Sequence, residues 1–177
     1  MPEIILPDAK PAFEWVNGRV LQKVSPQRKH ALAQTRFAVA LDAWSAALDN
    51  GMVGTEWRFA LQPPGEERRT LVPDIAFLSY ERMPSEEQEM TDVPCIAPDA
   101  VVEILSPDDR REDVEEKSRV YLAAGTRVIF VVDPDQRTVI ARDASGSRIA
   151  RDSEMLEHSA LPGFCMPVRT LFQLRHK

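Results

Sequence analysis

Short hydrophobic runs separated by polar turns dominate the chain and predict a fold built largely on strands. Residues 13–16 and 19–21 are two β-prone runs around Asn17-Gly18, a dipeptide that favours a tight hairpin turn. Residues 53–61 and 71–78 form a second pair of runs, separated by a polar loop. We therefore expect this second pair to lie antiparallel as well.

A helix of about 20 residues is predicted between these two hairpins. It extends from about residue 30 to 49, and Asn50-Gly51 is expected to end it. Its apolar stripe recurs at helical spacing and consists of Phe37, Leu41, Trp44 and Leu48. The polar, proline-bearing segment 79–99 predicts a long irregular connection.

The middle of the chain has the order strand, helix, strand. Residues 100–105 predict a strand, and Asp108 or Asp109 is expected to cap the helix that follows. Gly125 would end that helix, and residues 127–132 form a strongly apolar strand. Such a βαβ unit favours a parallel strand pair with a right-handed crossover.

The fold class follows from combining the hairpins with the βαβ unit. Residues 138–142 predict a further strand, and residues 147–174 a last hairpin with a short helix or strand. We predict an α/β or α+β fold with a central mixed β-sheet flanked by helices. The length of 177 residues suits one domain, 1–177, with a core from about 13 to 174.

Composition narrows the function classes. The longest apolar run is far too short to cross a bilayer, and the N-terminus lacks the pattern of a signal peptide, so we expect a cytoplasmic protein without a membrane partner. The formal net charge is −6, whereas proteins that grip nucleic acid by bulk electrostatics are usually basic. Any activity on nucleic acid would depend on a local basic surface, a metal ion or tight specificity.

Two carboxylates interrupt predicted strands where apolar side chains are expected. Glu103 shares one strand face with Val101 and Leu105, and burial of an unpaired carboxylate is costly. A salt bridge at the sheet margin and a functional role explain Glu103 equally well. Asp74 is the polar interior member of residues 71–78, although an aspartate after proline is also common in turns.

Lys117 is a third anomaly, on the helix after the strand of Glu103. At 100° per residue it falls near the centre of the apolar side of that helix. The side chains around it on this side are Val120, Tyr121, Leu122 and Ala124, whereas Glu112, Glu115, Glu116 and Arg119 crowd the opposite side. A lysine there either extends its ammonium to water past the core or is held by carboxylates.

Convergence of Asp74, Glu103 and Lys117 would create a specific chemistry. Carboxylate oxygens are natural ligands of Mg²⁺, and bound Mg²⁺ can polarise a phosphate and activate water. A nearby ammonium can orient that water or neutralise charge on the phosphate oxygens. The constellation indicates metal-assisted hydrolysis of a phosphodiester.

The motifs LVPDIAFLS, APDAVVEILSP, EEKSRVYLAAG and VVDPDQRTV resemble the Uma-type family of bacterial endonucleases. This family is a domain of unknown function within the PD-(D/E)XK nuclease superfamily. The segments FEWVNGRVL, SPQRKH and LPGFCMPVRTLF resemble its N-terminal hairpin, the start of its first helix and its C-terminal ending. The resemblance covers residues 13–174 and implies a restriction-endonuclease-like fold, a nucleic-acid substrate such as DNA, and a homodimer.

The resemblance also implies a Mg²⁺ or Mn²⁺ site. Asp74 and Glu103 would be metal ligands, assisted by the backbone carbonyl of Ile104. The superfamily lysine expected two residues after the acid is absent, because Leu105 stands there. Lys117 would replace it, as the family pattern indicates.

Other residues match the family or adjoin its site more weakly. Glu14 matches a glutamate of the family's hairpin and is either an extra acidic ligand or water-orienting group of the catalytic site, or a solvent-facing strand residue. His30 matches a family histidine, although a lone histidine here is more often structural. Glu56 could border the site, and Arg110 and Arg111 could meet phosphates, although a solvated loop explains the arginines better.

Three function classes remain open from the sequence. A metal-dependent endonuclease is favoured by Asp74, Glu103 and Lys117. A binding or regulatory module that kept the nuclease fold without turnover is favoured by the acidic charge and the displaced lysine. A purely structural protein would place the three side chains apart. A serine hydrolase is disfavoured, because no histidine–acid pair is placed by the sequence to activate Ser106.

Overall fold

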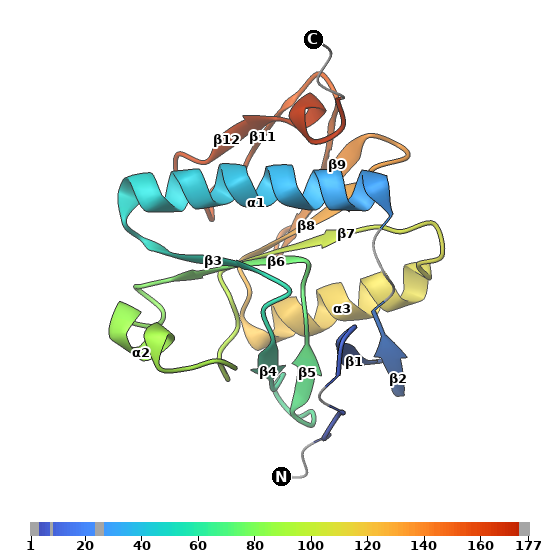
Figure 1. Ribbon diagram of the computed structural model, residues 1–177, viewed down its shortest axis with the longest axis vertical. Helices are drawn as coiled ribbons and strands as arrows, with labels where there is room; N and C mark the ends of the chain where they lie inside the picture. The colour runs from blue at the N-terminus through green and yellow to red at the C-terminus, as the bar shows by residue number, and fades with distance from the viewer. Residues whose placement is uncertain (1–3, 8, 24–26, 174–177) are drawn as a thin grey trace.

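A six-stranded mixed sheet forms the centre of the molecule (Figure 1). The computed structural model describes residues 4–7, 9–23 and 27–173. The strands lie in the order β10-β9-β8-β7-β6-β3. They are β3 (Gly51–Thr55), β6 (Ile75–Ser79), β7 (Ala100–Ile104), β8 (Val128–Asp133), β9 (Thr138–Asp143) and β10 (Gly146–Arg151). β7 and β8 pair in parallel and the other neighbours are antiparallel, which confirms the predicted βαβ unit and mixed sheet.

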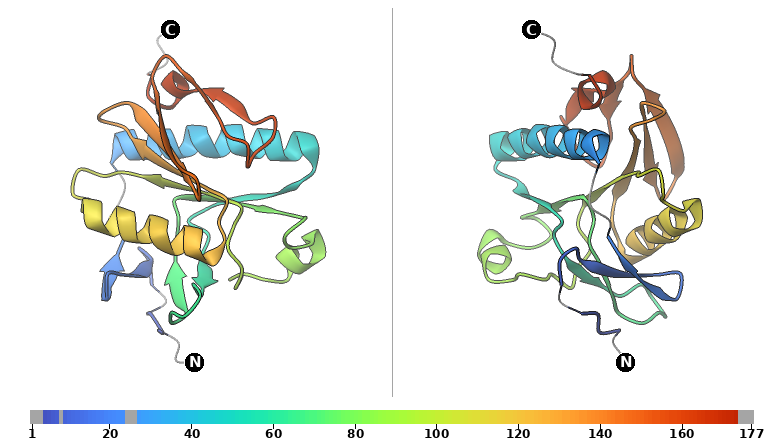
Figure 2. Two further views of the ribbon diagram at one scale, coloured as in Figure 1. Left: turned by 180° about the vertical axis from the view of Figure 1, so that it is seen from behind. Right: turned by 45° about the vertical axis from the view of Figure 1, so that its right-hand side comes forward.

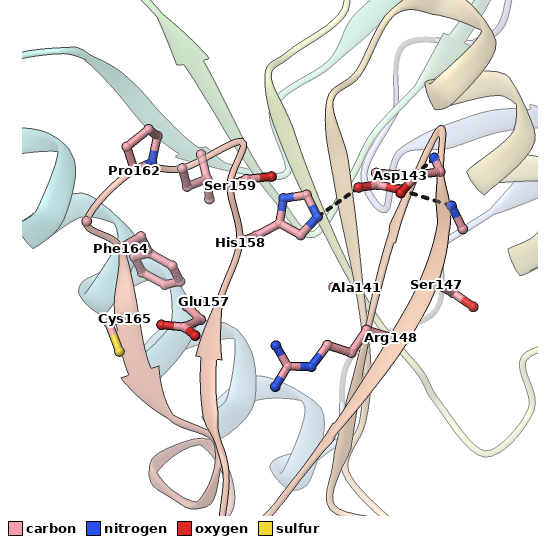
Figure 3. A pocket seen from close by; sticks show the side chains of 14 residues that line it. Ala141, Asp143, Ser147, Arg148, Glu157, His158, Ser159, Pro162, Phe164 and Cys165 are labelled. Atoms are coloured by element: carbon pink, nitrogen blue, oxygen red, sulfur yellow. Dashed lines mark hydrogen bonds and ion pairs between the residues drawn. The ribbon is translucent and has the colours of Figure 1, made fainter.

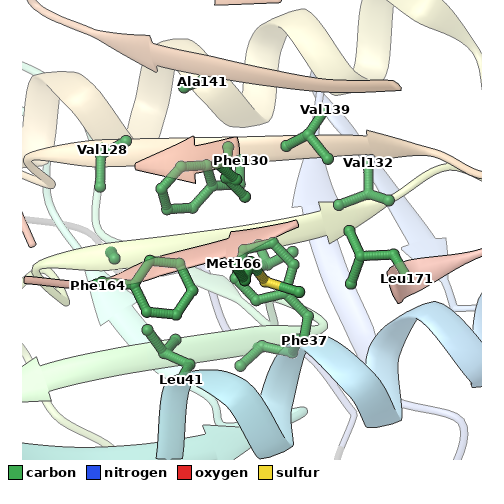
Figure 4. Packing of buried hydrophobic residues seen from close by; sticks show 14 of the residues in the cluster. Phe37, Leu41, Val128, Phe130, Val132, Val139, Ala141, Phe164, Met166 and Leu171 are labelled. Atoms are coloured by element: carbon green, nitrogen blue, oxygen red, sulfur yellow. The ribbon is translucent and has the colours of Figure 1, made fainter. Parts of the chain in front are cut away.

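Two helices cover opposite faces of this sheet, as Figures 1 and 2 show. α1 (Arg28–Leu48) packs Phe37 and Leu41 against one face, where Phe130 and Phe164 complete an aromatic core (Figure 4). α3 (Arg111–Ala124) packs Val120 and Tyr121 against the other face. Side chains of β7 alternate between the two cores, with Val102 and Ile104 in the first and Val101 in the second.

The end of α1 differs from the prediction. Leu48 is 54% exposed, and the buried residue one turn after Leu41 is Ser45, whose hydroxyl donates to the Gly51 carbonyl. The predicted stop at Asn50-Gly51 was also wrong, because Asp49 takes the left-handed conformation that ends the helix. Asp tolerates this conformation better than most residues, because its short side chain can bond locally.

The long hairpin of residues 53–61 and 71–78 is antiparallel as predicted, but each strand is broken in two. β3 pairs with β6 in the central sheet, whereas β4 (Phe59–Leu61) and β5 (Arg69–Leu71) form a separate ribbon. Glu56, with φ of 52°, marks the break on one side. The break on the other side leaves Asp74 just before β6, outside the strand ladder.

The N-terminal hairpin consists of β1 (Phe13–Val16) and β2 (Arg19–Gln22), as predicted. Asn17 and Gly18 both have positive φ, as a tight hairpin turn requires. Val16 is fully buried in the core beneath α3. The tip is tied to α3, because Asn17 and Arg19 both donate hydrogen bonds to Asp113.

The remaining elements are short. They are α2 (Ser85–Glu89), β11 (Met155–Glu157), β12 (Cys165–Pro167) and the 3-10 helix η1 (Val168–Leu171). α2 lies in the segment predicted to be irregular. Arg110, and not Asp108 or Asp109, precedes α3, and Asp109 accepts a hydrogen bond from the Ser106 N–H.

Ser25 and Pro26 of the SPQRKH motif, and Leu174 at the end of the predicted core, lie outside the described residues. Among the helices that the structure describes, none is long and apolar enough to cross a bilayer.

Candidate active site

A pocket of about 650 Å³ opens at the end of the sheet where β7 stops. The hairpin β1–β2 lines one side, and the loop from β7 to α3 lines another. All five side chains or backbone groups predicted for the site line it, namely Glu14, Asp74, Glu103, Ile104 and Lys117. They come from four separate segments of the chain, so only the folded structure brings them together.

Asp74 is 3% exposed and held by three groups. Its Oδ2 accepts a hydrogen bond from the Ile104 N–H at 2.7 Å and lies 3.2 Å from His30 Nε2. Its Oδ1 lies 2.6 Å from Lys23 Nζ. Because Ile104 directly follows Glu103, the bond to Ile104 places the Asp74 carboxylate beside the Glu103 strand position.

The Asp74 carboxylate is stabilised in its charged form. Burial raises the pKa of Asp74, but the hydrogen bond with His30 and the charge of Lys23 outweigh burial. The pKa of Asp74 is therefore held below its usual range. Asp74 remains a carboxylate throughout the physiological pH range.

Lys117 connects Glu103 with Glu14. Its Nζ lies 2.6 Å from Glu103 Oε2 and 3.1 Å from Glu14 Oε2, and all three side chains are nearly buried. Glu14 Oε1 also accepts a hydrogen bond from the Val72 N–H, and Glu103 Oε1 accepts one from the Tyr121 hydroxyl. Of the two arrangements that the sequence left open for Lys117, the structure has the ammonium held by carboxylates.

Charge is unevenly balanced in this cluster, because three carboxylates share two ammonium groups. Burial raises the pKa of Glu103 to about 7, and the neighbouring Asp74 and Glu14 add to the rise against the opposing charge of Lys117. Burial lowers the pKa of Lys117, but Glu103 and Glu14 outweigh it and hold that pKa above its usual range. Lys117 therefore stays protonated and cannot act as a general base.

Two contributors to the site, Lys23 and Tyr121, were not predicted as site residues from the sequence. Lys23 was not singled out, because it follows an exposed hairpin strand and shows no pattern of its own. Tyr121 was placed on the inner side of α3, but its hydroxyl bond to Glu103 depends on the tertiary packing. His30 is nearly buried and its Nε2 lies 3.2 Å from Asp74 Oδ2, so it is a hydrogen-bonded histidine as expected, with a candidate ligand as its partner.

The weaker candidates separate into two groups. Glu56 and Arg110 line the pocket, although both are exposed. Arg111 does not line it and faces another hollow along the outer side of α3. Of the two arginines, only Arg110 is positioned to meet a ligand in the pocket.

The donor set suits a hard divalent cation. Seven carboxylate side chains line the pocket against five lysine and arginine side chains, so a cation would relieve an excess of negative charge. Mg²⁺ is commonly held by one or two carboxylates together with water and substrate phosphates. Within the described part of the chain, no group of three or more His, Cys, Asp or Glu side chains could hold a metal by itself. The residues present are therefore compatible with a divalent ion that takes its other ligands from water or a substrate.

A second hollow lies between β9–β10 and the β11–β12 region (Figure 3). It contains a histidine–acid pair, with His158 Nε2 3.2 Å from Asp143 Oδ2. The other ring nitrogen, Nδ1, accepts a hydrogen bond from the Ala160 N–H. Both nitrogens of His158 are engaged, and Ser106 lies in the other pocket, so this pair does not create a serine hydrolase.

Comparison with known proteins agrees with the fold and the motifs. Residues 3–169 match the model of the Uma2 family, described as "Putative restriction endonuclease". Five chains of solved structures are similar, among them the crystal structure of a putative nuclease belonging to DUF820 from Anabaena variabilis. It is 27% identical with a TM-score of 0.82, covering 94% of this chain and 93% of that one. No curated protein matches the chain. The predicted family and the restriction-endonuclease-like fold class are confirmed.

Proposed function

The chain belongs to the Uma2 family of putative restriction endonucleases, and from this premise we propose that it is a metal-dependent endonuclease. Its substrate would be nucleic acid, in the first instance DNA, and its reaction the hydrolysis of a phosphodiester bond. The observation that carries this proposal is the meeting of Asp74, Glu103 and Lys117 in one nearly buried pocket.

Asp74 and Glu103 are the residues proposed to hold Mg²⁺ or Mn²⁺, with the Ile104 carbonyl as a third oxygen donor. Each carboxylate oxygen has two lone-pair sites, and Asp74 Oδ1 and both oxygens of Glu103 each have one described partner. Capacity for a cation therefore remains. When bound, the ion would supply a positive charge for a phosphate oxygen and lower the pKa of a water.

The other residues of the site act on the substrate or on these ligands. Lys117 would stabilise the negative charge that develops on the phosphate oxygens, because it stays an ammonium in a site with little water. Glu14 is the second carboxylate that holds this ammonium, beside Glu103. Tyr121 and His30 would fix the orientations of Glu103 and Asp74.

The proposed reaction consumes one water for each bond cleaved. The water oxygen forms a new bond to phosphorus, and the bond from phosphorus to the leaving oxygen breaks. One proton of the water is lost from the attacking oxygen, and the leaving oxygen takes up a proton. The products are a phosphomonoester end and a hydroxyl end.

A homodimer and a soluble location in the cytoplasm complete the proposal. One chain of 177 residues with a net charge of −6 has little electrostatic attraction for a duplex. Two copies would double the surface that contacts the substrate. Sedimentation in the presence and absence of a DNA duplex would measure this assembly.

The alternative function is a nuclease-fold module that binds or regulates without turnover. Leu105 at the usual lysine position and the acidic charge favour this alternative. The presence of a buried ammonium at Lys117, which can serve the same chemical role from α3, favours the enzyme.

Two measurements test the proposal. Calorimetry with Mn²⁺ should detect binding that is lost in Asp74→Ala and Glu103→Ala. Plasmid and single-stranded DNA should be nicked only with the metal, and Lys117→Ala should abolish nicking without abolishing metal binding. Lys29→Ala is the matched control, because Lys29 forms an ion pair of the same length on the surface. Metal binding without cleavage of any substrate would favour the alternative.

A further inference from the structure

Lys23 is a second ammonium of the pocket, outside the set of residues that the family motifs indicated. Its Nζ lies 2.6 Å from Asp74 Oδ1 and 2.9 Å from the Val72 carbonyl oxygen. The Lys23 side chain is 17% exposed and lines the pocket. The ion pair is therefore largely removed from water, unlike the surface pairs of this protein.

The two oxygens of Asp74 differ in the partners that hold them. Oδ2 receives the Ile104 N–H and faces His30, and both partners are fixed by secondary structure. Oδ1 contacts only Lys23 among the described hydrogen-bonding groups. Oδ1 is therefore the Asp74 oxygen with fewer described partners, and a metal ion bound to it would meet the Lys23 ammonium.

The negative charge of the buried carboxylates explains why Asp74 needs a cation beside it when no metal is bound. Asp74, Glu103 and Glu14 lie close enough to influence one another, and Lys117 already serves Glu103 and Glu14. Without Lys23, His30 would be the remaining described side chain within hydrogen-bond distance of the Asp74 carboxylate, and Lys117 would act on it only through its charge from farther away. Burial of a carboxylate without a compensating charge is strongly unfavourable.

We propose that Lys23 is a place-holding cation, which neutralises Asp74 in the metal-free protein and is displaced from Oδ1 when a divalent ion binds. This inference rests on the proposed function. Lysine suits the role, since its ammonium is a compact charge on a flexible four-carbon stem. The displaced ammonium can retain its hydrogen bond to the Val72 carbonyl and so stay in the pocket.

The test is the affinity of the metal-free protein for Mn²⁺, measured by calorimetry. Lys23→Met keeps the unbranched side chain at one atom shorter and removes the competing charge, so we expect the affinity to rise about tenfold. Lys29→Met is the matched control, because Lys29 pairs with Asp135 at the same 2.6 Å but both side chains are more than half exposed. The affinity of the Lys29→Met variant for Mn²⁺ should equal that of the wild type. If Lys23 had a purely structural role, the Lys23→Met variant would bind Mn²⁺ with unchanged or lower affinity. That result would overturn the inference.

A second measurement needs no variant and does not depend on the folding of Lys23→Met. Reductive methylation of the wild type, followed by mass spectrometry, reports the accessibility of each lysine amine. Mn²⁺ should accelerate methylation of Lys23 several-fold and leave Lys29 unchanged. Equal rates at Lys23 with and without Mn²⁺ would contradict its displacement.

The two proposals fail in different ways. Absence of Mn²⁺ binding in the wild type would remove both the metal-dependent function and the role of Lys23. Wild-type binding that is lost in Asp74→Ala but not strengthened in Lys23→Met would leave the proposed function standing and remove only the place-holding role.

Discussion

The stability of the metal-free protein should depend on the protonation of Glu103, and Glu103→Gln isolates this effect. The pKa of Glu103 is about 7 in the folded protein, against an ordinary value of 4.5. Between these values the unfolded glutamate loses its proton while the folded one keeps it. The contribution of Glu103 to the free energy of unfolding is therefore fully present below pH 4.5 and is lost as the pH rises through 7.

The magnitude follows from the difference between the two pKa values. At about 1.4 kcal/mol for each pKa unit, the whole effect is about 3 kcal/mol, of which about 2.5 kcal/mol falls between pH 5 and pH 8. Glutamine cannot titrate but keeps the shape of the side chain. The free energy of unfolding of Glu103→Gln, measured relative to that of the wild type, should therefore rise by about 2.5 kcal/mol from pH 5 to pH 8.

The assay is urea unfolding in the presence of a chelator, followed by circular dichroism at several pH values. Glu112→Gln, at an exposed position at the start of α3, is the control and should follow the wild type at every pH. Excess Mg²⁺ should abolish the advantage of Glu103→Gln, because a bound cation favours the ionised carboxylate. Parallel stability curves for the wild type and Glu103→Gln in chelator would refute this account of the site.

Three further substitutions test other parts of the structure. Tyr121→Phe removes the hydroxyl bond to Glu103, so it should cost about 1 kcal/mol and move the pH transition of stability upward, as urea titrations at several pH values would show. Phe37→Ala opens the core under α1 and should lower the free energy of unfolding by about 3–5 kcal/mol without changing the affinity for Mn²⁺. Asp113→Ala frees Asn17 and Arg19, and because this pair is partly exposed it should cost about 1 kcal/mol or less while accelerating amide exchange in β1–β2.

Local patterning was sufficient to predict most elements and their pairing. Asn17-Gly18 predicted the first hairpin, because few other dipeptides adopt two successive positive φ values at low cost. The order of strand, helix and strand predicted the parallel pair of β7 and β8, because a short connection cannot join parallel neighbours. Glu103 and Lys117 were identifiable because each places a charge on an otherwise apolar face of a regular element.

Errors arose where tertiary contacts outweighed local preference. Leu48 continues the helical stripe of α1, yet it is exposed because the chain turns away from the core at Asp49. The strand predicted over residues 71–78 is interrupted before Ile75, and a uniform β pattern could not indicate this break. The break frees Asp74 from the ladder and allows it to bond the Ile104 N–H of the neighbouring strand.

The chain itself identifies a mixed α/β sheet and three charged residues that are unusual for a core. The partners of those charges, Lys23, His30 and Tyr121, depended on the folded arrangement. Hydrophobic periodicity acts between neighbours along one element, and so it can be recognised in a linear pattern. A buried ion pair such as Lys23 with Asp74 joins residues 51 positions apart, and its energy exists only when packing brings them together and excludes water.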